Sequence, residues 1–159
     1  MVGFARGFMP PEKNTQKARS DSARAALLKA GRKLFGKSGF LSTSVNEVAA
    51  AAGMSKSGLL HHFSSKAALF EAVFEEEEKR LVAQVATEAA DAPGAKARMK
   101  RGARALLDAL NDPVSRQITL IDGPAVLGWT QWRKIEAAYG IALIQTTLEE
   151  AQAEGSISS

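Results

Sequence analysis

Residues 43–63 constrain the fold more than any other part of the chain, because they encode two short helices joined by a tight turn. Ser44 and Glu47 have the spacing of a capping box, in which each side chain accepts a hydrogen bond from a free amide at a helix start. Gly53 stands where a helix commonly ends in a residue with positive φ, and Ser55 is a favourable N-cap for the next helix. The sequence therefore predicts helices over 44–52 and 55–62.

The two predicted helices differ in the faces that they present. The first has an apolar stripe at i, i+3, i+4 and i+7 whose small residues let another helix approach closely: Val45, Val48, Ala49 and Ala52. The second is anchored inward by Leu59 and Phe63. Its other residues are small, polar or cationic groups that suit contact with phosphates and base edges: Lys56, Ser57, Gly58, Leu60 and His61. This arrangement is typical of a helix-turn-helix, whose second helix can enter the major groove of DNA.

The segment resembles the N-terminal domain of the TetR family of transcriptional regulators from about Arg24 to Phe70. The residues that carry the resemblance are Leu34-Phe35, Gly39-Phe40, Thr43-Ser44-Val45, Val48-Ala49, Ala52-Gly53, Ser55-Lys56, His61-His62-Phe63 and Ser65-Lys66. Two positions depart from the family pattern. Leu60 stands where many members have a Tyr that touches a phosphate, and Ser57 stands where Gly is common. Leu60 cannot donate that hydrogen bond, but its side chain can contact a thymine methyl group.

The resemblance implies an all-α fold, with a three-helix head followed by a helical body for effector binding and dimerisation. The implied function is a sequence-specific DNA-binding transcriptional regulator, and more closely a repressor that a small effector releases from a double-stranded DNA operator. The residues expected to face base edges are Lys56, Ser57, Gly58, Leu60 and His61. Those expected to contact phosphates are Thr43, Ser44, Ser55, His62 and Lys66.

Charge is distributed unevenly along the chain. Residues 1–70 hold 11 Lys and Arg against 3 Asp and Glu, whereas residues 71–159 hold 10 against 14. A basic front half suits a polyanionic partner, and its coincidence with the motif strengthens both inferences. The absence of cysteine excludes disulfides and thiolate chemistry. No membrane span, signal-peptide pattern or cofactor motif is evident, so we expect a soluble cytoplasmic protein without a cofactor.

The expected domain organisation has three parts. Residues 1–20 are predicted to be a disordered basic tail, either an arm that reaches the DNA or a solvated tail. Residues 21–81 are the expected DNA-binding domain, and residues 82–159 the ligand-binding and dimerisation domain. The first helix is predicted to run from about Asp21 to Lys37, where Gly36 and Gly39 end it. The fourth helix is predicted to run from about Ser65 to Ala89.

An acidic run in the predicted fourth helix, residues 75–78, resembles a metal site only superficially. Consecutive residues point to different sides of a helix and do not converge on one ion. We expect i,i+4 ion pairs from Glu75 to Lys79 and from Glu76 to Arg80, on a solvated face.

The body is predicted to contain a helix over 95–110, a short helix around Ile118, and a long helix from Gly128 to Ala153. The family resemblance places an effector pocket among these helices. Seven residues are candidates to line it, with ordinary core packing as the alternative for each: Met99, Leu106, Ile118, Ile121, Trp129, Trp132 and Tyr139.

The family usually continues with two further helices that pair with those of a second copy in a homodimer. Because the sequence stops at Ser159, we expect the chain to be truncated or to dimerise in another way.

The sequence also bears on two other classes of function. An enzyme would use His61 and His62 for acid–base chemistry or metal binding, but adjacent side chains diverge by about 100° on a helix and cannot share one ion. No paired carboxylates, phosphate loop or nucleophile elbow accompanies them, so neither catalysis nor a metal is expected. The other class is a helical module that binds a small molecule or partner chain without regulating DNA.

Overall fold

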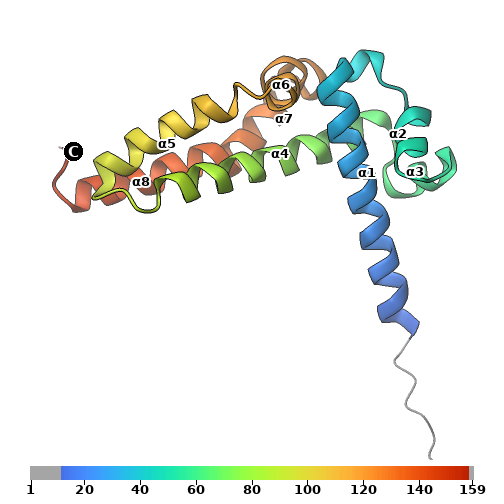
Figure 1. Ribbon diagram of the computed structural model, residues 1–159, viewed down its shortest axis with the longest axis horizontal. Coiled ribbons are helices and arrows are strands. Elements are labelled where there is room, and N and C mark those ends of the chain that lie inside the picture. Colours follow the sequence, from blue (N-terminus) through green and yellow to red (C-terminus); the bar gives the residue numbers. More distant parts are fainter. Residues whose placement is uncertain (1–11, 158–159) are drawn as a thin grey trace, which may run out of the picture.

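The computed structural model describes residues 12–157, and every regular element in that part of the chain is helical, as the sequence predicts. The head contains α1 (Glu12–Ser42), α2 (Val45–Ala51) and α3 (Lys56–His62). The long α4 (Lys66–Ala89) leads from the head into the body. The body adds α5 (Ala95–Ala109), α6 (Pro113–Arg116), η1 (Gln117–Asp122), α7 (Gly123–Glu136), η2 (Ala137–Ile141) and α8 (Ala142–Ala153). Figure 1 shows α5, α4 and α8 running lengthwise, with α1 crossing their end.

The two helices of the helix-turn-helix begin at the predicted caps. The Ser44 side chain accepts a hydrogen bond from the Glu47 amide at 3.2 Å, and the Glu47 carboxylate accepts one from the Ser44 amide at 2.7 Å. At the start of α3, the Ser55 hydroxyl accepts a hydrogen bond from the Gly58 amide at 3.1 Å. Gly53 between them has a φ of 71°. The capping box, the glycine turn and the N-cap are therefore all confirmed.

The first helix is longer than the sequence suggests. Helix α1 begins at Glu12, so the prediction of a disordered tail is wrong for residues 12–20, while residues 1–11 lie outside the described part. Good helix formers continue through this stretch, and the side chains from Thr15 to Ser22 are exposed. At the other end the helical path breaks at Gly39, whose φ of 78° only glycine adopts readily.

The second glycine expected to end α1 has another purpose. Gly36 lies inside the helix and is buried, and a Cβ added there would overlap Cγ1 of Val114 on α6. The glycine therefore lets the head and the body approach closely, and its predicted role as a helix terminator is wrong.

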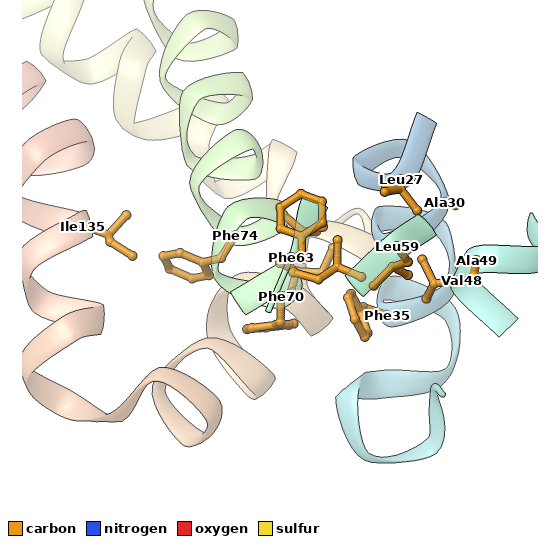
Figure 2. Close-up of a cluster of buried hydrophobic side chains, with 13 residues drawn as sticks. Leu27, Ala30, Phe35, Val48, Ala49, Leu59, Phe63, Phe70, Phe74 and Ile135 are labelled. Carbon is orange, nitrogen blue, oxygen red and sulfur yellow. The ribbon is translucent and has the colours of Figure 1, made fainter. Parts of the chain in front are cut away.

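A single hydrophobic core joins the head to the body. Phe35 of α1 and Phe70 of α4 meet edge to face with ring centroids 5.3 Å apart, and Phe40 makes the same contact with Phe70. One turn further along α4, Phe74 extends the cluster toward Ile135 of α7, as Figure 2 shows. Aromatic burial of this kind supplies much of a small domain's stability. The head is thus packed against the body rather than tethered to it.

The body departs from regular α-helix at three places. The long helix predicted from Gly128 to Ala153 forms α7, η2 and α8, with a break at Gly128 and a π-helical turn at η2. A second π-helical stretch, η1, follows α6. None of the helices within residues 12–157 is long and apolar enough to cross a membrane.

Candidate nucleic-acid interface and ligand cavity

The outer face of α3 is available to a partner. The side chains of Lys56, Ser57 and His61 are exposed, and Leu60 is 40% exposed, whereas Leu59 is fully buried beneath them. The inward and outward faces of α3 are therefore those expected from the sequence. The face carries a cation, hydroxyls and imidazole groups on a helix that begins at a serine cap. These groups can donate hydrogen bonds to phosphate oxygens and base edges.

Four further predicted contact residues border this face. Ser44 and Ser55 are exposed at the starts of α2 and α3, while their hydroxyls serve as helix caps. Gly58 and His62 are half-buried, and the His62 ring meets the His61 ring edge-on at 5.6 Å. Arg24 of α1 lies over the ring of Phe63, with 5.1 Å between the guanidinium carbon and the ring centroid. This contact fastens the end of α3 to α1.

Two residues predicted to touch phosphates have other partners inside the head. Thr43 is only 3% exposed, and its hydroxyl donates a hydrogen bond to the Gly39 carbonyl at 2.8 Å. The Lys66 ammonium donates to the carbonyls of Phe40 and Thr43 at 2.9 and 3.0 Å, and it lies 4.2 Å from the centroid of the Phe40 ring. Burial removes the Thr43 hydroxyl from the surface, which corrects its predicted role. Lys66 stabilises the backbone before α2.

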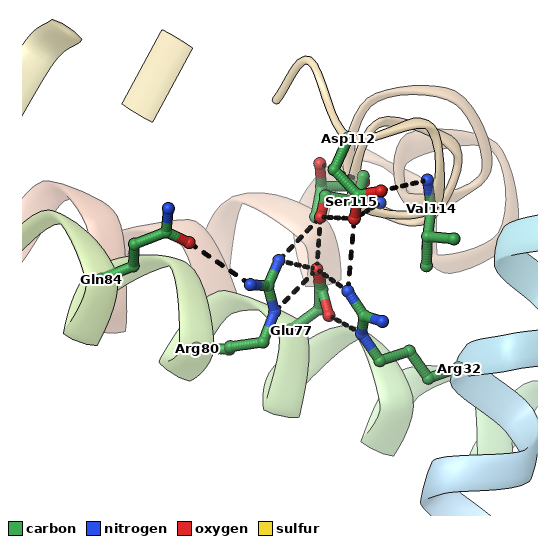
Figure 3. A network of polar contacts seen from close by, with 8 residues as sticks. Arg32, Glu77, Arg80, Gln84, Asp112, Val114 and Ser115 are labelled. Atoms are coloured by element: carbon green, nitrogen blue, oxygen red, sulfur yellow. Dashed lines mark hydrogen bonds and ion pairs between the residues drawn. The ribbon is translucent and has the colours of Figure 1, made fainter. Parts of the chain in front are cut away.

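A buried carboxylate connects three elements where the head meets the body (Figure 3). Glu77 of α4 is 1% exposed and accepts hydrogen bonds from Arg32 of α1 at 2.6 and 3.1 Å. It also accepts from Arg80 at 2.6 Å and from the Ser115 hydroxyl at 2.7 Å. Burial by itself raises the pKa of Glu77, but these hydrogen bonds outweigh it and hold the pKa at about 2. The network is completed by Asp112, which accepts hydrogen bonds from Arg32 and from the backbone amide of Ser115.

The network overturns the prediction of a solvated acidic face. Within residues 75–78, Glu77 and Glu78 are both buried, and only Glu76 forms an exposed ion pair, with Lys79 at 2.8 Å. The ion pairs are i,i+3 rather than the predicted i,i+4, because Arg80 turns toward Glu77.

A cavity of about 480 Å³ lies between α4, α5, η1, α7, η2 and α8. Its walls are mostly aliphatic, with Leu81 and Val85 on α4 and Ile144 on α8. Met99, Leu106 and Trp132 line it as predicted. A volume of this size is typical of sites for small organic ligands.

The other four predicted pocket residues lie elsewhere, which corrects their assignment. Ile118 is fully buried in the core shared with the head, whereas the next two residues, Thr119 and Leu120, line the cavity. Ile121 and Trp129 are 53% and 68% exposed. Tyr139 packs beside the core, with the Lys79 ammonium 5.8 Å from its ring centroid.

Sequence reasoning missed two acidic residues in the cavity wall. Glu78 is 5% exposed, and burial, followed by the neighbouring charges of Glu136 and Glu77, raises its pKa to about 8. Burial also raises the pKa of Glu136, against the opposing charge of Arg133. The spacing of residues in the sequence could have indicated the burial of Glu78. Glu78 lies three and four positions before Leu81 and Val82, so it shares their apolar face.

Two family models match the chain in regions that correspond to the head and the body. The model described as bacterial regulatory proteins, tetR family, matches residues 27–73, which contain the helix-turn-helix. The model described as tetracyclin repressor-like, C-terminal domain, matches residues 96–159. No curated protein matches the chain.

Solved structures share the fold. The fatty acid degradation regulator FadR from Bacillus halodurans is 16% identical, with a TM-score of 0.70 over 83% of this chain and 69% of that one. A TetR family transcription regulator from Marinobacter aquaeolei VT8 is 21% identical, with a TM-score of 0.65 over 86% and 70%. AibR, in complex with isovaleryl coenzyme A and operator DNA, is 23% identical, with a TM-score of 0.63 over 86% and 76%.

Three findings indicate the same family: the helix-turn-helix geometry, the two matching family models and the shared fold. The chain belongs to the TetR family of bacterial regulatory proteins and is a DNA-binding transcriptional regulator.

Proposed function

We propose that this regulator is a repressor that binds its operator through α3 and leaves it when a small ligand enters the cavity. The observation that carries the proposal is the pairing of an exposed polar α3 with a mostly apolar cavity, joined by one packed core. The proposed division is a DNA-binding domain over 21–81 and a ligand-binding and dimerisation domain over 82–159. The protein binds its double-stranded DNA operator as a homodimer.

The proposed contacts with DNA fall into two sets. Lys56, Ser57 and His61, with Gly58 and Leu60, face base edges and determine which sequence is bound. Ser44, Ser55, His62 and the remaining N–H group of Lys66 contact phosphates and set the position of the head on the duplex. The amide groups at the start of α4 also favour a phosphate there, because a helix N-terminus carries partial positive charge.

The proposed signal travels through two elements that touch both the cavity and the head. In η1, Thr119 and Leu120 line the cavity, and Asp122 accepts a hydrogen bond from the Phe40 amide at 2.8 Å. In α4, Glu78 faces the cavity while Glu77 binds Arg32 of the head. A ligand that moves either element therefore displaces the head. In a dimer, this displacement changes the spacing of the two α3 helices relative to successive major grooves.

A comparison of DNA and ligand effects tests the proposal. Duplex DNA from the region upstream of the protein's own gene should bind more tightly than a scrambled duplex at the same salt concentration. A ligand identified by its stabilisation of the protein against heat should weaken that binding. AibR, whose structure contains both an acyl-coenzyme A and operator DNA, supports the idea that this fold serves both partners. Equal affinity for the two duplexes at low and high salt would contradict the proposal.

A further inference from the structure

We propose that the cavity binds a hydrophobic organic cation, with its charged atom between the carboxyl groups of Glu78 and Glu136 and its apolar part against Trp132. The inference rests on the proposed ligand-responsive function and adds to it the class of ligand.

The charges around the cavity favour a cation. Only three charged residues line it within the part of the chain that the structure describes: Glu78, Arg98 and Glu136. The guanidinium of Arg98 donates hydrogen bonds to Glu150 at 2.9 Å and Glu154 at 3.1 Å, so two carboxylates already balance its charge. The elements η1 and α8 contribute no charged residue to the described wall. The two glutamates are therefore the acidic groups of this described wall that no ion pair balances, and in their ionised form they attract a cation and repel an anion.

Glu78 is buried and Glu136 is half-buried in the cavity wall, and the charge of Arg133 acts on Glu136 without a hydrogen bond or ion pair. Neither Glu78 nor Glu136 forms a hydrogen bond or ion pair with another residue between positions 12 and 157, in contrast to Glu77. An unpartnered acidic group in an apolar wall costs free energy, and a leucine there would pack without that cost. A bound cation supplies the missing partner for both carboxyl groups at once.

The aromatic and backbone surroundings suit the same ligand. Trp132 lines the cavity, and its buried Nε1 has no hydrogen-bond partner among the described residues. An aromatic side chain in the wall suits a cation, because the face of an aromatic ring attracts positive charge. Glu136 is followed at once by the π-helical turn η2, and a Cβ added at Gly140 would lie 3.4 Å from its Oε2. Such turns within a helix occur frequently at functional sites.

Binding of a cation should release a proton from the protein. The pKa of Glu78 is about 8, because the group is buried and lies near Glu136 and Glu77, so it is largely protonated at neutral pH. A permanent cation favours the ionised carboxylate, and the affinity should therefore rise as the pH rises toward 8. Arg98, on α5, already has its own two acceptors and does not oppose this change.

Two ions of matched shape and opposite charge test the proposal. Tetraphenylphosphonium and tetraphenylborate both have four phenyl groups and do not titrate, so any effect of pH reports on the protein. Calorimetric titration of the whole chain at several pH values from 6 to 9 should show binding of the cation in preference to the borate. Its affinity should rise by up to about ten-fold per pH unit below pH 8 and level off above it.

Three glutamine substitutions test which residues are responsible for cation binding and for its pH dependence. Glu78→Gln and Glu136→Gln should each weaken tetraphenylphosphonium binding by about ten-fold or more, and Glu78→Gln should also flatten the pH dependence. Glu88→Gln, an exposed residue of α4 outside the cavity, should leave the affinity unchanged.

Equal affinity for the two ions, absence of cation binding at every pH, or insensitivity to both cavity substitutions would overturn the inference. DNA binding by the unsubstituted protein is measured in parallel. If the protein binds DNA specifically but ignores the cation, only this inference fails, whereas failure to bind DNA specifically contradicts the proposed function.

Discussion

Glu77 and Glu78 are consecutive residues of α4, yet their carboxyl groups occupy opposite electrostatic environments. Glu77 accepts hydrogen bonds from Arg32, Arg80 and Ser115, which overcome the effect of burial and hold its pKa at about 2. At the next position, burial and nearby carboxylates raise the pKa of Glu78 to about 8. One carboxyl group connects the head to the body and the other faces the cavity. Helix α4 therefore relates the two functional regions through adjacent side chains.

Removing the charge of Glu77 should weaken the junction between head and body. Glu77→Gln leaves two guanidinium groups without their carboxylate, and the free energy of unfolding should fall by about 2–4 kcal/mol, as expected when one partner of a buried ion pair is removed. Urea denaturation measures this change. Glu76→Gln is the matched control, because Glu76 pairs with Lys79 on the exposed side of the helix. Its effect should stay below about 1 kcal/mol, and equal effects of the two substitutions would contradict the assigned role of Glu77.

The same carboxylate should contribute to acid unfolding. Its pKa is lowered in the folded state from an ordinary 4.5 to about 2, so its stabilisation is present above pH 4.5 and is lost as the pH falls toward 2. Stability measured between pH 5 and pH 2.5 should therefore fall more steeply in the unsubstituted protein than in Glu77→Gln. Parallel curves for the two proteins would show that Glu77 is not held ionised.

Glu78 should have the opposite dependence on pH. Its pKa is raised from 4.5 to about 8 on folding, so the folded state binds the proton more tightly and loses relative stability as the pH rises between these values. Glu78→Gln mimics the protonated form, and it should stabilise the protein by about 1–3 kcal/mol at pH 8 with a smaller effect near pH 5. Thermal or urea unfolding at both pH values checks this. A substitution that destabilises the protein more at pH 8 than at pH 5 would contradict the raised pKa.

Close packing at Gly36 should be sensitive to one methyl group. Gly36→Ala places a Cβ against Val114, and the resulting shift of α6 should lower the free energy of unfolding by about 1–3 kcal/mol, although alanine is the better helix former. Val114→Ala removes part of the obstruction. The double variant should therefore be more stable than the sum of the two single effects predicts. Strict additivity would show that the two residues do not press on each other.

Lys66 allows a structural role to be separated from a phosphate contact. Lys66→Ala removes two hydrogen bonds to backbone carbonyls, so the free energy of unfolding should fall by about 1–3 kcal/mol. If the ammonium also contacts a phosphate, the slope of log affinity against log salt should become shallower by about 0.9 for every duplex tested. A stability loss with an unchanged slope would assign Lys66 to the backbone alone.

The head was predictable because its signals are local. The caps at Ser44 and Ser55, the glycine turn and the inward Leu59 are each set by a few neighbouring residues, and all lie as the sequence indicates. The family resemblance rests on the same short segment, and the matching head model over residues 27–73 confirms it.

The residues that were misassigned depend on partners distant in the sequence. Glu77 can be buried because Arg32 and Ser115 donate hydrogen bonds to it. Arg32 lies 45 positions earlier and Ser115 lies 38 positions later, so no local sequence pattern predicts either contact. Gly36 resembles a helix terminator until α6 is placed against it. In the body, half-polar helices do not reveal which apolar residues face a cavity. The predictions for Met99, Leu106 and Trp132 are confirmed, because all three line the cavity. Trp129 lies outside the cavity, with its ring centroid 5.2 Å from that of Trp132.

The most direct test of the central claim is fluorescence anisotropy of a labelled duplex from upstream of the gene, titrated with protein at two salt concentrations. A scrambled duplex measures nonspecific binding. Lys56→Ala and His61→Ala should reduce the preference for the upstream duplex by about ten-fold, because base contacts carry specificity. Glu88→Gln, on the exposed side of α4 in the body, should leave that preference intact. If both α3 variants discriminate between the two duplexes as well as the unsubstituted protein does, α3 is not the element that recognises the operator.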